Sequence, residues 1–176
     1  MIYNPENGFT EPSRPGRRYG VEWLNYWRAR PWLTIDADLA FSQARFAADP
    51  NGVGTRIPDA VAGVYSAGLS VAERDGWSGS LRGRYLGPRA LVENGSVVSP
   101  SSFVLNGQIG KAIGHRWTVV LEGFNLLNRK YDDIVYYFST RLRDPRIGVV
   151  ESGDTSDFVT HPAEPRSARL RIEVRF

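Results

Sequence analysis

The sequence contains no cysteine, so disulfide bonds, thiol catalysis and cysteine-ligated metals are excluded. It contains only two histidines, His115 and His161, which leaves little material for a histidine-based metal site or a catalytic triad. No long apolar run is present, since the longest ends after five residues, from Ile134 to Phe138. A transmembrane helix needs about 20 such residues. A helical membrane protein is therefore excluded, and an enzyme is not expected.

A large excess of charge of one sign is also lacking. The net charge is +3, and arginines alternate with acidic residues along the chain. Nucleic-acid-binding proteins usually concentrate basic residues in one patch, so no nucleic-acid partner is expected. The first 20 residues contain no apolar core of the kind that a signal peptide requires, so no signal peptide is expected in this chain.

What the sequence does contain is strict alternation of apolar and polar residues. In residues 168–176, Ala168, Leu170 and Phe176 share one face with the other apolar side chains, and three arginines and a glutamate occupy the other. A period of two over this length predicts a β-strand with one apolar face. The same pattern recurs in 33–41 and 77–85, and more weakly in 19–27, 61–71, 103–111 and 117–123. No segment has helical periodicity with caps, so an all-β fold of about seven strands is expected.

Short and long connections alternate between these strands. The short ones fall at 28–31, 72–76 and 112–116, and the long ones at 42–60, 86–102 and 124–166. Short connections join antiparallel neighbours, so the strands form an antiparallel meander with every short turn at one end. Outer-membrane β-barrels have this asymmetry, with short periplasmic turns and long extracellular loops.

Tryptophan supports the same interpretation. Trp32, Trp77 and Trp117 each follow a short turn, which puts them at one level of the sheet. Tryptophan is enriched at membrane interfaces. The alternative is that these are core aromatics near the turns of a soluble sheet, and Trp32 is out of phase with the apolar face of its strand.

Alternation alone does not say which face meets water, because a soluble barrel turns its apolar face inward and a membrane barrel turns it outward. The loop asymmetry, the tryptophan level and the terminal Phe176 favour the membrane.

Several stretches together resemble the C-terminal barrel portion of TonB-dependent outer-membrane receptors. The most specific is Phe124-Asn125-Leu126-Leu127-Asn128-Arg129-Lys130-Tyr131, which resembles the family's Asn-Leu-Phe-Asp/Asn-x-x-Tyr signature on the penultimate strand. The other matching stretches are 18–23, 31–40, 76–87 and the His161-Pro162 segment that leads into the last strand. The resemblance covers nearly the whole chain.

The resemblance implies a location in the outer membrane and a role in the uptake of a siderophore-like or other scarce solute, with no cofactor. It implies contact with outer-membrane lipid and with the barrel-assembly machinery, which would read Phe176 as an assembly signal. It also implies a parent receptor that supplies the remaining strands and a plug, on which the TonB energy-coupling complex acts. The chain is expected to be a single partial barrel domain and a fragment that does not function alone. It divides into an extracellular-loop-like lead-in (1–17), six strands (18–127), a long loop (128–165) and a final strand (166–176).

The last long loop contains the candidate ligand-facing residues. Tyr136 and Tyr137, followed by Arg141 and Arg143, form an aromatic and basic stretch that could touch a ligand. The alternative is that 133–140 pairs with 147–160 as an extended hairpin, which would raise the strand count to eight. Clustered carboxylates in this loop could hold Ca²⁺. They lack the spacing of a known Ca²⁺ loop, so a solvated loop without a bound ion is expected. These carboxylates are Asp132, Asp133, Asp144, Glu151, Asp154 and Asp157.

The polar faces of the strands are expected to line the barrel lumen, where charges are usually paired or hydrated; the residues are Asp36, Asp38, Arg82, Arg84, Asn106, Gln108 and Glu122. Two other functions stay open at this point. One is a small free-standing β-barrel or sandwich with a binding or structural role, and the other is a lipocalin-like soluble carrier. The sequence does not identify the transported ligand.

Overall fold

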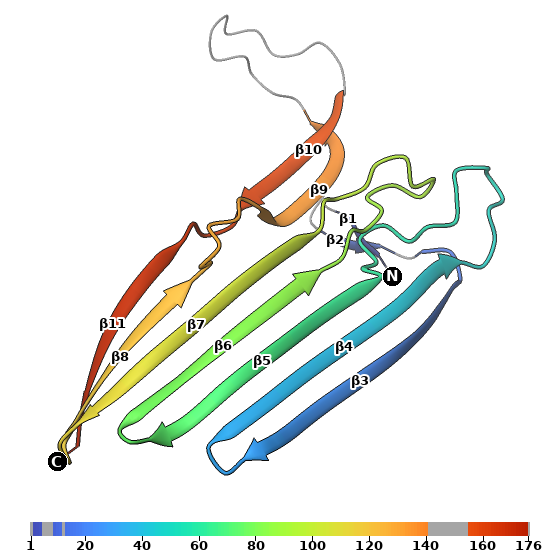
Figure 1. Cartoon of the computed structure of the whole chain (residues 1–176). Coiled ribbons are helices and arrows are strands. Elements are labelled where there is room, and N and C mark those ends of the chain that lie inside the picture. Colours follow the sequence, from blue (N-terminus) through green and yellow to red (C-terminus); the bar gives the residue numbers. More distant parts are fainter. Residues whose placement is uncertain (1, 5–8, 12, 141–154, 176) are drawn as a thin grey trace, which may run out of the picture.

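The computed structural model of the chain describes residues 2–4, 9–11, 13–140 and 155–175. Its centre is one seven-stranded antiparallel sheet in the order β11-β8-β7-β6-β5-β4-β3 (Figure 1). The strands are β3 (Gly16–Arg30), β4 (Leu33–Phe46), β5 (Gly63–Arg74), β6 (Trp77–Leu86), β7 (Ser102–Ile113), β8 (Trp117–Phe124) and β11 (Ser167–Val174). This confirms the predicted antiparallel meander of seven strands. No helix long and apolar enough to cross a membrane occurs in the described part of the chain.

Most of the strands are longer, and the short turns tighter, than the sequence pattern predicted. The β5–β6 turn contracts to Asp75 and Gly76, and both have positive φ, at 54° and 76°. This is the backbone of a type I′ hairpin turn, whose twist matches that of the flanking strands and for which Asp-Gly is a preferred pair. The first 17 residues also differ from a plain loop, because β1 (Ile2–Asn4) pairs with β2 (Phe9–Glu11) and β3 already begins at Gly16.

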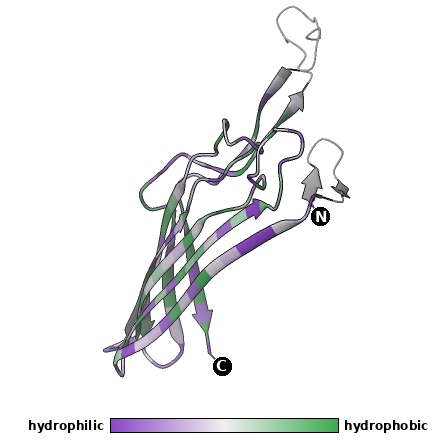
Figure 2. Ribbon diagram, turned by 90° about the vertical axis from the view of Figure 1, so that its right-hand side faces the viewer, coloured by the Kyte–Doolittle hydropathy of each residue, from purple (hydrophilic) through white to green (hydrophobic). Residues whose placement is uncertain are grey.

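The register sorts the side chains of the whole sheet onto two faces, as the alternation in 33–41 and 77–85 predicted. Leu39 of β4 is aligned with Tyr65 of β5, which is aligned with Tyr85 of β6 and through it with Phe103 of β7. Such alignment of alternating strands keeps apolar side chains on one face throughout, and hydropathy alternates along the ribbons in Figure 2. We call this the apolar face, and the opposite one the polar face.

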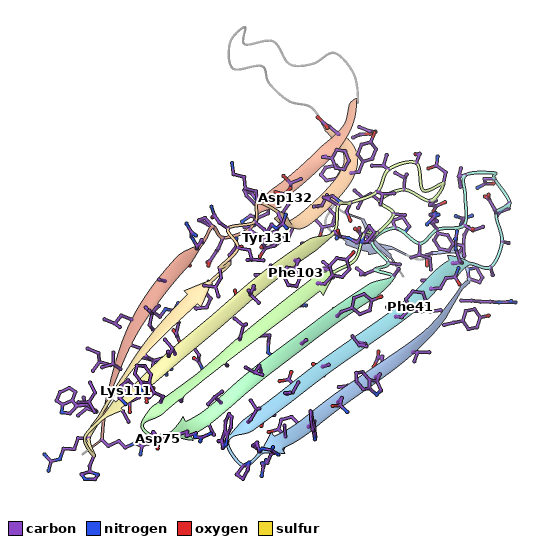
Figure 3. The ribbon with its side chains drawn as sticks, in the orientation of Figure 1. Phe41, Asp75, Phe103, Lys111, Tyr131 and Asp132 are labelled. Carbon is purple, nitrogen blue, oxygen red and sulfur yellow. The ribbon has the colours of Figure 1, made fainter. Side chains whose placement is uncertain are left out.

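The apolar face is bordered by aromatic side chains at both ends. Phe41, Tyr65, Tyr85 and Phe103 lie toward the long loops, where Tyr65 and Tyr85 stack with centroids 5.7 Å apart. Trp27, Trp77 and Trp117 lie toward the short turns. Figure 3 labels Phe41 and Phe103 at one end and Asp75 and Lys111 at the other. From Trp77 to Tyr85 the strand covers about 26 Å, or roughly 20 Å along a barrel axis at the usual tilt, close to the ~25 Å apolar band of outer-membrane barrels.

In the described part of the chain, neither face of the sheet is covered by another layer (Figure 2). Leu81, Leu121 and Leu170 on the apolar face are 44%, 50% and 64% exposed. The buried apolar side chains that the structure describes are few and lie mostly among the loops; they are Phe46, Ala90, Leu91, Val120 and Val135. A soluble protein does not leave such an apolar surface open to water, so this face is built to meet another apolar phase or partner.

The polar face carries the predicted lumen residues, and some of their charges are paired. Asp36 and Arg82 lie in register with Gly68 on the strand between them, and their side chains meet over it at 2.6 Å. On β8, Glu122 lies 3.5 Å from Arg171 and 3.8 Å from Arg169 of β11. Of the predicted lumen residues, Asp36, Arg82 and Glu122 are therefore paired with opposite charges.

We expect Gly68→Ala to destabilise the sheet through the Asp36–Arg82 pair. A Cβ at Gly68 would lie 2.6 Å from Asp36 Oδ1 and 2.7 Å from Arg82 Nη2, so the pair has to separate. Because Arg82 is about half exposed, the pair is worth no more than about 1 kcal/mol. Urea unfolding of the chain in detergent micelles should show that Gly68→Ala lowers the free energy of unfolding in the wild-type background. In a chain that already carries Asp36→Asn, Gly68→Ala should have little further effect. An equal cost in both backgrounds would show that the pair is not responsible.

Candidate functional site

All the long connections gather at one end of the sheet and form a cluster of loops (Figure 1). Loop 47–62 joins β4 to β5, loop 87–101 joins β6 to β7, and 125–166 joins β8 to β11. The asymmetry predicted from the sequence is therefore present. Binding residues are disproportionately found on loops held by a rigid scaffold, so this end is the candidate functional site.

Arg89 connects all three of these loops. Its Nε donates to Asp59 Oδ1 at 2.9 Å, and its Nη2 donates to the carbonyl oxygen of Val135 at 3.2 Å. Within its own loop, the Arg89 N–H donates to Ser99 Oγ and the Arg89 carbonyl accepts from the Ser99 N–H; Ser99 is 1% exposed. The Arg89 side chain is only 12% exposed. A guanidinium with its donors directed to three segments fixes how those segments lie relative to one another.

Arg14 also connects separate segments of the loop cluster. Its guanidinium forms an ion pair with Glu93 and lies 3.6 Å from Asp49. It also donates to the backbone carbonyls of Ala48 and Gly54, both at 3.1 Å. The segment before β3 is thereby tied to the two loops that follow β4 and β6.

Asn125, in the stretch that resembles the family signature, is a structural junction. It is 3% exposed and has a left-handed backbone, with φ 46°. Its Nδ2 donates to the carbonyls of Arg129 and Glu164, and its Oδ1 accepts from the Arg129 N–H. Its own N–H donates to Asn106 of β7. This one side chain therefore joins the end of β8 to the start of the segment that returns to β11.

The last long loop forms the predicted extended hairpin. β9 (Asp132–Thr140) pairs with β10 (Thr155–Pro162), which covers the described part of the predicted partner segment 147–160; residues 147–154 lie outside the described residues. The hairpin is a separate two-stranded sheet, so it adds no eighth strand to the main one. It projects beyond the other loops, with Tyr131 and Asp132 at its base (Figure 3).

The structure places two of the four candidate ligand-facing residues. Tyr136 and Tyr137 lie side by side on β9 and point to opposite faces of the hairpin. Tyr137 packs edge-on against Phe158 of β10, with centroids 5.4 Å apart, and Val159 is aligned with Tyr136. Arg141 and Arg143 lie outside the described residues, as does Phe176. Asp144, Glu151 and Asp154 of the acidic set lie there too.

The carboxylates of the last loop that are described do not converge. Asp157 accepts a hydrogen bond from the next backbone N–H, and Asp133 is bonded to His161. Across the described ranges, no group of three or more His, Asp or Glu side chains is arranged to hold a metal ion.

His161, to which the sequence analysis gave no role, is the partner of Asp133. The ring Nδ1 lies 2.8 Å from Asp133 Oδ1, and this hydrogen bond lowers the pKa of the Asp133 carboxyl. A carboxylate with a lowered pKa contributes stability above its ordinary pKa. That contribution is lost as the pH falls through the folded-state value. The hairpin is therefore expected to lose this interaction only in acid.

We expect the carboxyl carbon of Asp133 to titrate below the ordinary aspartate midpoint in an NMR titration. His161→Ala should raise the midpoint toward its ordinary value, because the hydrogen bond from His161 is the largest cause of the lowered pKa. His115→Ala is the control, since His115 lies in the turn between β7 and β8. An Asp133 midpoint that His161→Ala leaves unchanged would contradict this assignment.

Sequence reasoning missed Arg14, Arg89 and Trp27. Arginine is so frequent in this chain that nothing local distinguishes these two partly buried ones, whose partners in other loops lie 30 to 79 positions away. Trp27 could have been found from the alternation, since it lies on the apolar face opposite Ile35 near the short turns.

No family model matches the sequence, and no curated protein does. Similarity to solved structures is clear. The ferric yersiniabactin uptake receptor FyuA from Yersinia pestis superposes with a TM-score of 0.70 at 16% identity, over 92% of this chain and 24% of that one. The closed form of the ferric-catecholate import receptor Fiu from E. coli K12 gives 0.67 at 16%, over 97% and 22%. The siderophore receptor PiuA from Acinetobacter baumannii gives 0.66 at 12%, over 90% and 21%.

The chain thus spans about a fifth to a quarter of the length of these receptors. At these identities the similarity concerns the fold. The described sheet, with its loops at one end and its two distinct faces, has the fold of a segment of a TonB-dependent outer-membrane receptor barrel, as the sequence resemblance predicted.

Proposed function

We propose that this chain forms part of the wall of an outer-membrane receptor barrel and contributes loops to the site that captures a scarce solute. The observation that carries the proposal is the uncovered apolar face between two aromatic rows, on a sheet whose long loops all lie at one end. In the membrane that face meets lipid, the polar face lines the lumen, and the loops face the exterior. The chain performs no catalysis in this role.

The edges of the sheet support a role as part of a larger barrel. β3 and β11 both run from the long-loop end to the short-turn end, because they are the first and last strands of an odd-numbered meander. A second copy that joined β3 to β11 would pair them in parallel, unlike every other pair in the sheet. Antiparallel closure needs an odd number of additional strands, which gives the even total usual for single-chain bacterial barrels. Unpaired edges in lipid cost several kcal/mol for each unsatisfied backbone group, so closure is strongly favoured.

The solute is proposed to be a siderophore-like metal chelate, captured at the loop cluster. Fiu is named as an importer of ferric catecholate, FyuA as an uptake receptor for ferric yersiniabactin and OprC as a copper transporter. Tyr136, Tyr137, Arg141 and Arg143 are proposed to face the solute, because aromatic and cationic groups suit anionic aromatic chelates. A plug inside the barrel and the TonB complex acting on it are proposed to supply energy coupling, and the assembly machinery to recognise Phe176.

A hybrid receptor tests this proposal. The part of FyuA that superposes on this chain is replaced by residues 13–176, and the outer-membrane level and ferric yersiniabactin uptake are measured. The hybrid should reach the outer membrane, and removal of Phe176 should lower that level severalfold. Absence of the hybrid from the outer membrane, in cells where unmodified FyuA is present, would count against a role in the barrel wall. Equal levels with and without Phe176 would remove the assembly signal alone.

A small free-standing barrel or a lipocalin-like carrier is the competing function. Either would enclose the apolar face, whereas the described sheet leaves it open. The full chain should therefore be insoluble in plain buffer and regain β-structure in detergent. A soluble, monodisperse monomer that unfolds cooperatively in buffer would favour the carrier.

A further inference from the structure

Three arginines lie side by side where the apolar face ends near the long loops. Arg17 of β3 is aligned with Arg45 of β4, and Arg45 forms a β-bridge with Arg56 of the following loop. Residues aligned in this way point to the same side of a sheet. Arg17 shares its face with Val21, and Arg45 shares its face with Phe41, so this arginine row belongs to the apolar face.

The nearby carboxylates are committed elsewhere. Glu93 and Asp49 form ion pairs with Arg14. Asp49 also accepts hydrogen bonds from the backbone N–H groups of Val53 and Gly54. Asp59 pairs with Arg89. Among the described residues no ion pair involves any member of the arginine row. Like charges directly opposite each other destabilise a sheet, so binding of anions would stabilise the row.

The position of the row matches that of lipid head groups. Along the β3–β4 ladder, the aligned pairs from mid-sheet toward the loops are Trp23 with Leu39, Val21 with Phe41, Tyr19 with Gln43, and Arg17 with Arg45. The surface thus changes from apolar to amphipathic to cationic. Arg45 lies about 13 Å along the strand beyond Phe41. Head groups border the hydrocarbon at this distance, and the long arginine side chain bridges the remainder.

We propose that the arginine row binds the phosphates of a lipid in the leaflet on the long-loop side. Guanidinium groups bind phosphate oxygens in bidentate fashion, and three of them are better neutralised by a head group with more than one phosphate than by one with a single phosphate. This inference rests on the proposed function, because it needs the apolar face to lie in a bilayer.

The same face offers room for an acyl chain of that lipid. A recess of about 420 Å³ lies below the row toward mid-sheet. Small residues form its floor, among them Ala37, Ala67 and Gly83, and Leu39 and Tyr85 are in its walls. A free phosphate would use only the row, whereas a phospholipid uses the row and the recess together. Leu39 at the edge of the recess lies on the same face as Arg45, about 20 Å along β4 from it. We assign the site to a lipid because a phospholipid is long enough to reach both.

The test uses the full chain refolded in detergent, with bisphosphorylated lipid A as the probe and native mass spectrometry as the readout. At about 1 kcal/mol per basic residue, the triple variant R17Q/R45Q/R56Q should bind lipid A of the order of a hundredfold more weakly than wild type. Arg18→Gln is the matched control and should change affinity less than twofold. It removes one positive charge, from the position next to Arg17 on β3. Its side chain points to the polar face, where Arg18 Nη2 donates to Ser42 Oγ.

Circular dichroism checks the fold of each variant. Should the triple variant not fold, Arg56→Gln alone should weaken binding about fivefold, since Arg56 lies outside the continuous ladder. Inorganic phosphate in excess should not displace lipid A. Unchanged affinity in a folded triple variant, or tight binding of inorganic phosphate alone, would overturn the lipid site and leave the barrel-wall proposal standing. A chain that is a soluble monomer in buffer would overturn both.

Discussion

Leu81→Arg is expected to make folding into a bilayer less favourable by about 2–4 kcal/mol. Leu81 lies on the apolar face of β6, midway between Trp77 and Tyr85, and is therefore at the middle of the apolar band. Its side chain is 44% exposed, so no protein core is disturbed by the change. The cost comes from placing a guanidinium in hydrocarbon, where it is greatest at the midplane.

Ser80→Arg is the matched control for this prediction. Ser80 is the adjacent residue on the same strand and faces the polar side, opposite Ser70 and Gln108. The same charge on that side enters a hydrated lumen and should cost less than about 0.5 kcal/mol. Urea titrations of the chain in phospholipid vesicles compare the two variants. Equal costs, or a larger cost for Ser80→Arg, would mean that the apolar face does not contact lipid.

Arg89→Ala is expected to release the loop cluster, at a cost of about 3 kcal/mol. The substitution leaves Asp59 without its cation and the carbonyl of Val135 without its donor, although Val135 is only 3% exposed. Three loops lose their common partner at once. Because the sheet is built independently of Arg89, the loss should be confined to the loop end of the molecule.

Hydrogen exchange measures this effect region by region. Exchange should accelerate in loops 47–62 and 87–101 and in β9, and stay unchanged in β5 to β8. Arg84→Ala is the control, because Arg84 is exposed on the polar face of the strand that leads to Arg89, and no ion pair within the described residues involves it. Uniform acceleration across the sheet, or no change in the loops, would show that Arg89 does not organise the cluster.

The sheet could be predicted because its information is local. A period of two identifies a strand from its own residues, and the lengths of the connections set the direction and order of the strands. The face that each side chain takes could be predicted as well, because sliding one strand by a residue would send Leu39 or Tyr65 to the polar face. The β1–β2 pairing was missed, since strands of three residues carry too little alternation to be recognised.

The loop cluster could not be predicted, because its contacts are distant in sequence. Arg89 meets Val135 across 46 positions, and Arg14 meets Glu93 across 79. Which of many arginines becomes buried is decided by how the loops fold back, and no periodic pattern records that. Asn125 is an intermediate case, since the motif that contains it was found, while its role as a junction emerged only from its hydrogen bonds.

The most direct test of the account asks which face of the sheet touches lipid. Because the sequence has no cysteine, Leu81→Cys and Ser80→Cys each provide one unique site for a fluorescent label. The labelled chains are reconstituted in vesicles with and without brominated lipids, which quench only at contact range. We expect strong quenching by the lipid at position 81 and little at 80, with the reverse order for an aqueous quencher. Quenching by water-soluble iodide at position 81, without quenching by the brominated lipid, would contradict the assignment of the apolar face to the membrane.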